Sequence, residues 1–508
     1  MSNLRIFLIN PPVFHPGRYR RFLEEKPIQT YTMPIGIGYI AAVLEKEGYE
    51  VKAVDAYKMS WEEVKKIIKN FSPDIVGISC LTDQRASVYR LIRLVKEEIN
   101  SNIKIVLGGS HATLMYEQIL KHFPVDVIVL GEGEKTFLDL VKSIEAKEDL
   151  QRVKGIAFLK DGKVFKTQPR EAIEDLDSLP FPAYHFFDLD MYSGWELHKA
   201  VAAALGYESA VELRSAAIVT SRGCPWGCSF CSVSKIWGRK WRARSAKNVV
   251  DEIEMLVNKY DCKIIDFVDD IFSLDQKRVI DISEEIIKRK LKIFWGFETG
   301  TRHVSEEMLK KAAQAACKFI IYGVEAASQK VLKNVTKKTN IEITIKAFEM
   351  TKKAGIATGA FIMVGNPGES DATINETIKL LKEIKPDVIV NQILMIFPGT
   401  KLYERAKKEG FIDDRYWLTE LPAPYYEQQL NLQELIRLHR KIGYYKMNRL
   451  GILAKTLRDM IEVKYGISIT RRGIKKTTGV PVKSLWRTHS FEEIEDYYKN
   501  YEPSTYYL

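Results

Sequence analysis

The sequence predicts an α/β protein with an N-terminal doubly wound sheet, a central partial (β/α)6 barrel and a helical C-terminal region. Three observations lead to this fold class. The chain has 508 residues, which allows several domains at ~100–200 residues each. Its 46% hydrophobic and 28% charged residues are ordinary for a globular protein and argue against disorder or a coiled coil. Short apolar runs alternate with amphipathic helical stretches along most of its length.

The first unit, residues 1–148, contains five apolar runs of strand length. They are Leu4–Asn10, Val51–Asp55, Asp74–Cys80, Lys104–Gly109 and Asp126–Glu132. Helical patterns such as Gly38–Glu47 and Trp61–Asn70 separate them. Apolar strands alternating with helices are typical of a parallel sheet covered on both faces, so a flavodoxin-like sheet is expected.

Residues 149–212 are expected to form a linker with a hairpin, Gly155–Phe165, that turns at Asp161-Gly162. The second α/β unit spans residues 213–420. Its expected strands are Ala216–Ser221, Lys263–Val268, Lys292–Phe297, Lys318–Glu325, Ala357–Gly365 and Val388–Ile396. Six βα units predict a partial barrel with its active loops at the strand carboxyl ends. Residues 421–508 become helical and basic, with one long or kinked helix expected at Asn431–Asp459.

The bulk charge and the cysteine count narrow the function classes. The chain has 77 basic and 66 acidic residues, a net charge of +11, which suits anionic partners but is also explained by a solvated lysine-rich surface. Six cysteines form no disulfide framework, and the isolated Cys80, Cys262 and Cys317 are expected to be buried apolar residues. With no signal peptide pattern and no run of ~18 apolar residues, a cytoplasmic protein is expected.

The other three cysteines form the strongest motif. Cys224, Cys228 and Cys231 are spaced C-x3-C-x2-C in TSRGCPWGCSFCS, directly after an expected strand. Thiolates are the usual protein ligands of iron–sulfur clusters, and a cubane needs four ligands. Three cysteines without a nearby fourth leave one iron open for a small chelating molecule. A structural zinc is the alternative, but the motif lacks the second ligand pair that such sites normally have.

This motif, with the aromatic Phe230 before its last cysteine, resembles that of the radical S-adenosylmethionine superfamily. The resemblance extends to VDDIF (268–272), YGVEAAS (322–328), FIMVGNPGE (361–369) and FPGT (397–400), in the order the family would place them. It implies a [4Fe–4S] cluster on the three cysteines and S-adenosylmethionine contacts at Phe230, Asp269, Glu325, Ser328, Gly365 and Pro367. Ala326 and Ala327 depart from the usual Ser-Gly of the family.

The first unit resembles the cobalamin-binding domain fused to many such enzymes. The resemblance implies cobalamin contacts at Pro11, Pro12, Ser79, Thr82, Gly108, Gly109, His111, Gly131, Glu132 and Gly133. The chain lacks the D-x-H-x-x-G motif that ligates cobalt elsewhere, so His111 is expected to hydrogen-bond to backbone rather than to bind the metal. A vestigial domain or a site for another ligand is the alternative. A tRNA methylthiotransferase is excluded because its N-terminal domain needs three cysteines, and this one has only Cys80.

Together the two resemblances imply a radical enzyme that uses methylcobalamin to methylate an unactivated carbon. The alternative within the family is ring formation on a tetrapyrrole or lipid without methyl transfer. A non-catalytic cobalamin or nucleic-acid binding protein is the alternative outside it, although no nucleic-acid recognition module is found. Expected partners are a small-molecule or lipid substrate and an electron donor such as flavodoxin or ferredoxin.

The C-terminal region is expected to shape the substrate site. Its aromatic-rich segment, residues 413–429, contains Trp417 and Tyr426, which are more often core residues than substrate contacts. The basic helix at Asn431–Asp459 would suit peripheral contact with an anionic membrane.

Overall fold

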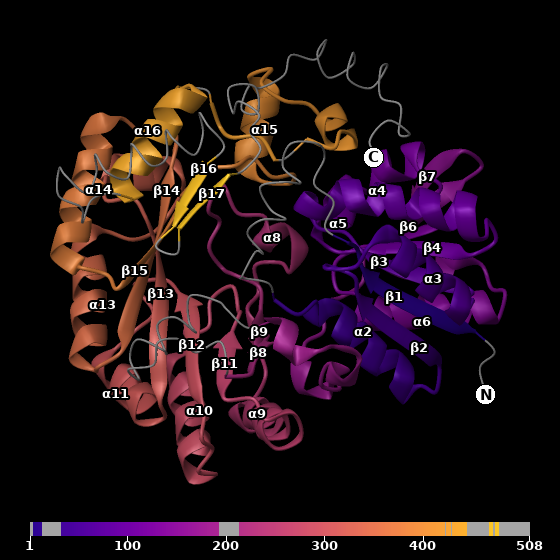
Figure 1. Cartoon of the computed structure of the whole chain (residues 1–508), viewed down its shortest axis with the longest axis horizontal. Coiled ribbons are helices and arrows are strands. Elements are labelled where there is room, and N and C mark those ends of the chain that lie inside the picture. Colours follow the sequence, from indigo (N-terminus) through magenta and orange to yellow (C-terminus); the bar gives the residue numbers. More distant parts are fainter. Residues whose placement is uncertain are drawn as a thin grey trace.

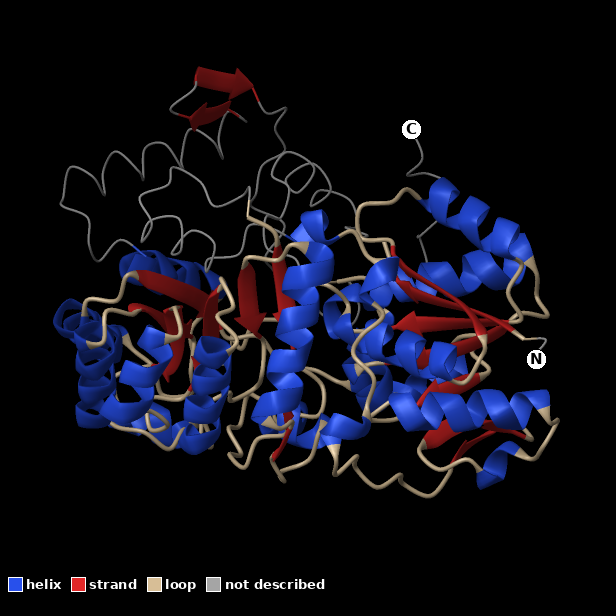
Figure 2. Cartoon of the chain, turned by 90° about the horizontal axis from the view of Figure 1, so that it is seen from below, coloured by secondary structure: helices blue, strands red, loops and turns tan. Residues whose placement is uncertain are grey.

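The computed structural model describes residues 4–12, 32–192, 213–421, 423–427, 429–443, 467–470 and 473–476. Within these residues, two largely parallel sheets, each with helices packed against it, form two α/β units that lie side by side (Figure 1). Helices flank both sheets in the second view as well (Figure 2). The predicted α/β class is therefore confirmed.

The first sheet has the order β2-β1-β3-β4-β5-β6-β7. Its parallel strands are β1 (Arg5–Asn10), β2 (Glu50–Asp55), β3 (Ile75–Ser79), β4 (Lys104–Gly108) and β5 (Val127–Val129). Its helices are α2 (Ile35–Lys46), α3 (Trp61–Phe71), α4 (Arg85–Arg93), α5 (Ser110–His122) and α6 (Glu134–Glu145). The order 2-1-3-4-5 is that of a flavodoxin-like doubly wound sheet, as predicted.

The hairpin predicted in the linker belongs to the first sheet. Its strands are β6 (Ile156–Lys160) and β7 (Lys163–Lys166), joined by Asp161 and Gly162, both at positive φ. Strand β6 pairs antiparallel with β5, whose backbone groups would otherwise form a free edge. The sequence predicts the hairpin and its turn but not this pairing. The alternation of apolar and polar residues indicates a strand but does not show which strand it pairs with.

The second sheet is parallel throughout, with the order β15-β14-β13-β12-β11-β8. Its strands are β8 (Ser215–Ile218), β11 (Ile264–Phe267), β12 (Phe294–Thr299), β13 (Cys317–Glu325), β14 (Ala357–Val364) and β15 (Val388–Ile393). Its helices are α9 (Ala246–Tyr260), α10 (Gln276–Lys288), α11 (Glu306–Gln314), α12 (Gln329–Asn334), α13 (Ile341–Lys353) and α14 (Asp371–Ile384). The partial (β/α)6 barrel is confirmed, and its strand carboxyl ends share one edge.

Side-chain caps explain where several of these helices begin. Ser60 and Glu63 form a capping box at α3, and Ser370 forms one with Thr373 at α14. The hydroxyl of Ser245 accepts from the Asn248 amide at α9. Because each cap fixes the end of one βα loop, it helps to set where the functional loops leave the sheets.

The C-terminal segment packs against both units. It contains α15 (Lys401–Lys408), the 3-10 helix η7 (Asp414–Leu418) and α16 (Leu432–Gly443), followed by a two-stranded hairpin of β16 (Ile467–Thr470) and β17 (Gly473–Lys476) that the sequence does not predict. Trp417 is fully buried and Tyr426 is 2% exposed, which confirms both as core residues. Helix α16 forms the start of the predicted helix Asn431–Asp459, whose residues after 443 lie outside the described residues.

The hydrophobic core is continuous across the two units. One large apolar cluster joins Ile6 of β1 with Ile218 of β8, and a second joins Phe7 of β1 with Trp417. Cys80, Cys262 and Cys317 are at most 2% exposed, as predicted. Among the described helices, none combines the length and apolar character needed to cross a bilayer.

Candidate cluster and cofactor site

The three motif cysteines lie on one loop between β9 (Ser221–Arg222) and α8 (Val233–Ile236). All three are free, half-buried thiols. Burial raises the pKa of each, to about 11 for Cys231, so their ionisation at neutral pH needs a bound cation. Among the described residues no His, Cys, Asp and Glu side chains gather in a group of three that could hold a single metal ion. Three thiols on one loop fit the three protein ligands of a cubane.

Gly223 is what lets this loop leave β9. Its φ of +89° is unfavourable for other residues, and a Cβ there would collide with the Lys240 carbonyl oxygen. We therefore expect Gly223→Ala to lower thermal stability and to reduce the iron and sulfide bound per chain. The backbone strain alone is worth about 1–2 kcal/mol. Iron and sulfide analysis after anaerobic reconstitution measures the effect.

Gly238 offers a matched control for this prediction. Its φ of +81° imposes the same strain, but a Cβ there would meet no atom within 4 Å. Gly238→Ala should therefore lower stability without lowering iron content. Equal iron loss in both variants would contradict a specific role for Gly223 in shaping the cluster loop.

The end of β13 forms the wall opposite the cluster loop. The Nζ of Lys337 lies 2.8 Å from the Oε1 of Glu325, and both charges act on the thiol of Cys228. Glu325 has a φ of +65° at an irregularity in the β13–β14 pairing. Ser328 is buried before α12 but makes no capping hydrogen bond with its side chain. Glu325 thus lies beside the cluster loop, and the predicted contact of Ser328 with S-adenosylmethionine stays a prediction.

Asp269 is held by hydrogen bonds within the protein, and its predicted contact with S-adenosylmethionine stays a prediction. Its carboxylate accepts hydrogen bonds from the Thr220 amide at 2.6 Å, the Thr220 hydroxyl at 2.6 Å and the Ser221 hydroxyl at 2.7 Å. Its neighbour Asp270 instead lies beside Cys224, whose pKa it raises. Desolvation and the Asp269 charge raise the pKa of Asp270 to about 6. Of the two adjacent acids in the sequence motif, Asp270 is the one that lies beside a cluster cysteine.

The carboxyl edge of the first sheet carries the other predicted ligand contacts. Pro11 and Pro12 are buried after β1, and Ser79 is half-buried at the end of β3. A Cβ on Gly108 would meet no atom within 4 Å, so this strand end has room for a ligand. Gly109, at φ +98°, lies against Cys80, and a Cβ there would approach the Cys80 carbonyl oxygen to 2.8 Å. Backbone approach at an open strand edge fits a broad, flat ligand.

His111 is a structural residue of this edge. Its ring is fully buried, with Nδ1 3.3 Å from the Thr82 hydroxyl and Nε2 3.4 Å from the Tyr89 hydroxyl. Burial and the charge of Arg85 hold its pKa well below the usual value, so the ring stays neutral. Its edge also faces the Trp417 ring. His111 therefore hydrogen-bonds within the protein, but with the hydroxyls of Thr82 and Tyr89 rather than with backbone as predicted.

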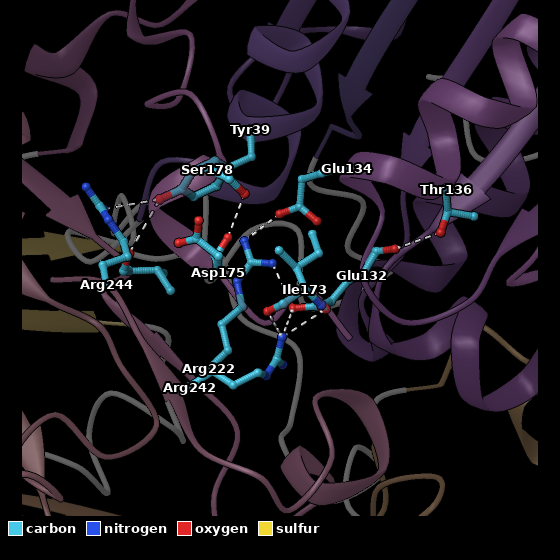
Figure 3. Close-up of polar contacts among 11 residues, drawn as sticks. Tyr39, Glu132, Glu134, Thr136, Ile173, Asp175, Ser178, Arg222, Arg242 and Arg244 are labelled. Atoms are coloured by element: carbon cyan, nitrogen blue, oxygen red, sulfur yellow. Dashed lines mark hydrogen bonds and ion pairs between the residues drawn. The ribbon is translucent and has the colours of Figure 1, made fainter. Parts of the chain in front are cut away.

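Glu132 is also engaged by the protein, and its predicted contact with cobalamin stays a prediction. Arg222 and Arg242 each donate to its carboxylate at 2.9 Å, and the Ile173 amide donates to it at 2.7 Å (Figure 3). Arg222 also pairs with Glu134. All four charged side chains are at most 8% exposed. We call Glu132, Glu134, Arg222 and Arg242 the ion clamp.

The ion clamp joins the two predicted ligand regions. Glu132 and Glu134 follow β5 of the first sheet, whereas Arg222 directly precedes Gly223 and Cys224. Arg242 lies on β10 (Arg242–Ala243), which pairs with β9. The clamp carries two positive and two negative charges, so burial leaves no net charge uncompensated.

Apolar contacts bring the same two regions together. A Cβ on Gly131, which follows β5 at φ +73°, would lie 3.7 Å from the carbonyl oxygen of Ile236 at the end of α8. Phe230 of the cluster loop packs against the apolar cluster that contains Phe7 and Ile9 of β1. Near Gly133, a Cβ would instead meet the Ile40 side chain. The cluster loop therefore lies against the carboxyl edge of the first sheet.

Comparison with known proteins agrees with this arrangement. Residues 27–141 match the B12 binding domain model, and residues 218–381 match the Radical SAM superfamily model. The chain is 32% identical over 421 residues to an uncharacterized methyltransferase of Pyrococcus horikoshii, covering 82% of this chain and 86% of that protein. The chain belongs to the radical SAM superfamily, in the branch with a B12-binding domain.

Two further relatives show the breadth of this branch. The anaerobic magnesium-protoporphyrin IX monomethyl ester cyclase of Rubrivivax gelatinosus is 35% identical over 404 residues, covering 77% of this chain and 70% of that protein. The structure of the radical S-adenosylmethionine methyltransferase TsrM from Kitasatospora setae, with cobalamin and a [4Fe–4S] cluster bound, has a TM-score of 0.64. It is 19% identical and covers 80% of this chain and 75% of that one, which shows a shared fold.

The cofactors of this radical SAM enzyme are a [4Fe–4S] cluster, S-adenosylmethionine and cobalamin. The fit is good for the cluster, whose ligands would be the three loop cysteines. Asp270 and Glu325, whose charges act on the loop cysteines, would flank S-adenosylmethionine bound at the open iron. Cobalamin would lie over Ser79 and Gly108 at the open first-sheet edge.

The fifth-strand motif is closed by protein contacts in the structure. Gly365 has a φ of +94°, and a Cβ there would approach the Leu435 side chain of α16 to 2.8 Å. Its amide donates to Glu369, and the Pro367 carbonyl accepts from the Asn334 side chain at 2.7 Å. Gly365 and Pro367 are thus engaged by contacts within the protein, and their predicted contacts with S-adenosylmethionine stay predictions. A glycine-containing turn has the same sequence pattern whether it packs against protein or contacts a ligand.

Two carboxyl groups inside the barrel were missed by sequence reasoning. Asp266 of β11 and Glu298 of β12 are half-buried on neighbouring strands. Burial raises the pKa of Asp266 to about 8, with a further contribution from the negative charge of Glu298. Burial raises the pKa of Glu298 to about 7, helped by the charge of Asp270. Strand alternation could have indicated both, since each polar residue interrupts an apolar run.

The raised pKa of Asp266 predicts a pH-dependent stability for the cofactor-free chain. Because an unfolded Asp titrates near ~4, the folded state binds the extra proton between about pH 4 and pH 8. Stability therefore falls as pH rises through this window. We expect Asp266→Asn to be more stable than the parent at pH 8, by at least about 1 kcal/mol. The difference should vanish toward pH 4; urea unfolding at both pH values measures it, and a pH-independent difference would contradict it.

Proposed function

We propose that this radical SAM enzyme methylates an unactivated carbon of a small-molecule or lipid substrate. The observation that carries the proposal is the contact of the cluster loop with the open edge of the first sheet, held by the ion clamp. When bound, the cluster and S-adenosylmethionine supply a hydrogen-abstracting radical, and cobalamin supplies a transferable methyl group. Adjacent sites allow both reagents to meet one substrate. The similarity to the Pyrococcus horikoshii methyltransferase, over most of both chains, supports the same reaction class.

The chain's own residues would position the reagents and exclude water. Cys224, Cys228 and Cys231 hold the cluster, and Asp270 and Glu325 flank it. The fully buried Trp417 of the C-terminal segment packs against His111 at the edge of the first sheet. A dry site protects a reactive radical from side reactions.

Oxidative ring formation without methyl transfer is the second candidate. It is favoured by the 35% identity to the magnesium-protoporphyrin IX monomethyl ester cyclase of Rubrivivax gelatinosus. Both reactions use the same cofactors, so the fold does not separate them.

One assay separates the two candidates without knowledge of the substrate. The anaerobically reconstituted enzyme is reduced and given S-adenosylmethionine with a deuterated methyl group. A methylase should form S-adenosylhomocysteine and deuterated methylcobalamin. A cyclase should form 5′-deoxyadenosine alone, which would overturn the proposal in favour of the second candidate. Failure to form either product would contradict both.

A further inference from the structure

A basic cleft lies on the outer side of the cluster loop. It has a volume of about 600 Å³ and is lined by Arg302, Gln329, Lys333, Thr336, Lys337, Lys338, Thr339, Asn340 and Ile343. Four of these residues are cationic and none is acidic. Among the described residues, Lys337 pairs with Glu325. The other three cations that line the cleft, Arg302, Lys333 and Lys338, have no carboxylate partner there. Such a concentration of uncompensated positive charge favours an anionic occupant.

Hydrogen bonds tie this cleft directly to the cluster loop. The Thr336 hydroxyl donates to the Gly227 carbonyl at 2.8 Å, and the Ser229 amide donates to the Val335 carbonyl at 3.0 Å. Both acceptor and donor on the loop flank Cys228. A partner bound in the cleft would therefore contact residues that are hydrogen-bonded to the immediate neighbours of the cluster ligand Cys228.

Trp226, between Cys224 and Cys228, links the cleft to the surface of the loop. The Arg302 guanidinium lies 5.9 Å and the Lys338 ammonium 5.6 Å from its ring centroid. Pro225 beside it is exposed. The loop that carries the cluster ligands thus reaches the surface within a ring of positive charge.

Two more exposed cations extend this ring beyond the cleft. The Arg239 guanidinium and the Lys401 ammonium both approach Gly227, as the neighbours of a Cβ built there show. Neither has a carboxylate partner within the described parts of the chain. Arg302, Lys333, Lys338, Arg239 and Lys401 thus place five cations without a carboxylate partner, among the described residues, around the turn between two cluster ligands.

We propose that this cationic surface docks an acidic electron-transfer protein that reduces the cluster. The proposal rests on the proposed function only in requiring a cluster that must be reduced. One electron leaves the reduced partner, which is oxidised, and enters the cluster, which is reduced; no bond forms or breaks. Electron-transfer complexes are small and weak, so complementary charge supplies much of their association rate. The exposed Pro225, next to Cys224, gives such a partner a surface directly beside a cluster ligand.

Charge reversal tests the proposal on the full reconstituted chain. Lys333→Glu with Lys338→Glu removes two exposed cations of the cleft and leaves the cysteines and Glu325 in place. The control, Lys66→Glu with Lys379→Glu, makes the same change of net charge on exposed positions of α3 and α14. The readout is the rate at which reduced flavodoxin, an acidic one-electron donor, produces the reduced cluster signal in electron paramagnetic resonance.

At low ionic strength the cleft variant should be reduced at least about ten-fold more slowly than the parent and the control. The difference should shrink as salt is added. Photoreduced deazaflavin, a small reductant, should reduce all three proteins at the same rate and support equal formation of 5′-deoxyadenosine. That second arm separates failure of docking from failure of the enzyme itself.

Two results would overturn the proposal. One is an unchanged flavodoxin rate in the cleft variant, or an equal fall in the control. The other is binding of inorganic phosphate that depends on Lys333 and Lys338 while the flavodoxin rate does not, which would assign the cleft to a small anion.

Discussion

Replacing Glu132 by alanine is expected to destabilise the chain by about 3–5 kcal/mol, because it leaves two arginines buried without their shared partner. Glu132 receives hydrogen bonds from Arg222, Arg242 and the Ile173 amide, and its side chain is 8% exposed. Arg222 would keep Glu134, but Arg242 has no other carboxylate partner among the described residues. Urea unfolding of the parent and the variant measures the loss.

The same substitution should also affect radical formation and methyl transfer to different extents. The clamp holds the strand before Cys224 against the loop after β5, so its loss should let the cobalamin edge shift relative to the cluster. We expect 5′-deoxyadenosine formation to fall less than S-adenosylhomocysteine formation in Glu132→Ala, assayed where the variant is still folded. A parallel fall of both products would contradict a positioning role.

Two controls separate the clamp from charge in general. Glu132→Gln keeps an acceptor for the Ile173 amide and lacks the charge, so it should lie between the parent and Glu132→Ala. Glu174→Ala removes the exposed partner of Lys240 on the same face. Because exposed pairs contribute little, Glu174→Ala should leave both stability and the product ratio close to the parent. A large effect of Glu174→Ala would show that any charge change here disturbs the junction.

Replacing Cys228 by alanine is expected to abolish formation of 5′-deoxyadenosine. Cys228 lies between the other two ligands on the loop, and the Glu325–Lys337 pair lies beside it. A cubane left with two protein thiolates loses the arrangement that leaves a single iron open. Reconstituted Cys228→Ala should show greatly reduced iron and sulfide content, measured alongside the product assay.

Cobalamin retention provides the internal control for this variant. The first-sheet edge does not depend on Cys228, so Cys228→Ala should hold as much cobalamin as the parent by optical spectrum. Cys317→Ala, at a cysteine buried in β13, should retain the cluster and the activity within the limits of its stability. Activity that survives in Cys228→Ala, or is lost equally in a folded Cys317→Ala, would contradict the assignment of the cluster ligands.

Much of this architecture could be predicted because it depends on local patterns. The strand β13 follows from an apolar run, and the cluster loop follows from a cysteine motif directly after an expected strand. The three cysteines form a motif only eight residues long, so their proximity is covalent. The sequence also predicts the hairpin β6–β7. Its position in the first sheet depends on pairing with β5, which no local sequence pattern indicates.

Several predicted ligand residues are engaged by protein partners that are distant in sequence, which local patterns do not reveal. Glu132 follows a glycine in a motif that resembles a ligand loop, yet Arg222 and Arg242 donate to its carboxylate from 90 and 110 residues away. Asp269 and Asp270 are adjacent, and Asp269 is the one that accepts hydrogen bonds from Thr220 and Ser221. Gly365 lies against Leu435, which belongs to a predicted helix whose packing partner the sequence does not give.

The central claim is that this one chain holds a radical-generating cluster and cobalamin against each other. The most direct measurement is anaerobic reconstitution with iron, sulfide and cobalamin, followed by reduction in the presence of S-adenosylmethionine. We expect about four iron atoms and an equimolar amount of cobalamin per chain, with release of 5′-deoxyadenosine. A chain that binds iron but neither retains cobalamin nor releases 5′-deoxyadenosine would contradict the claim.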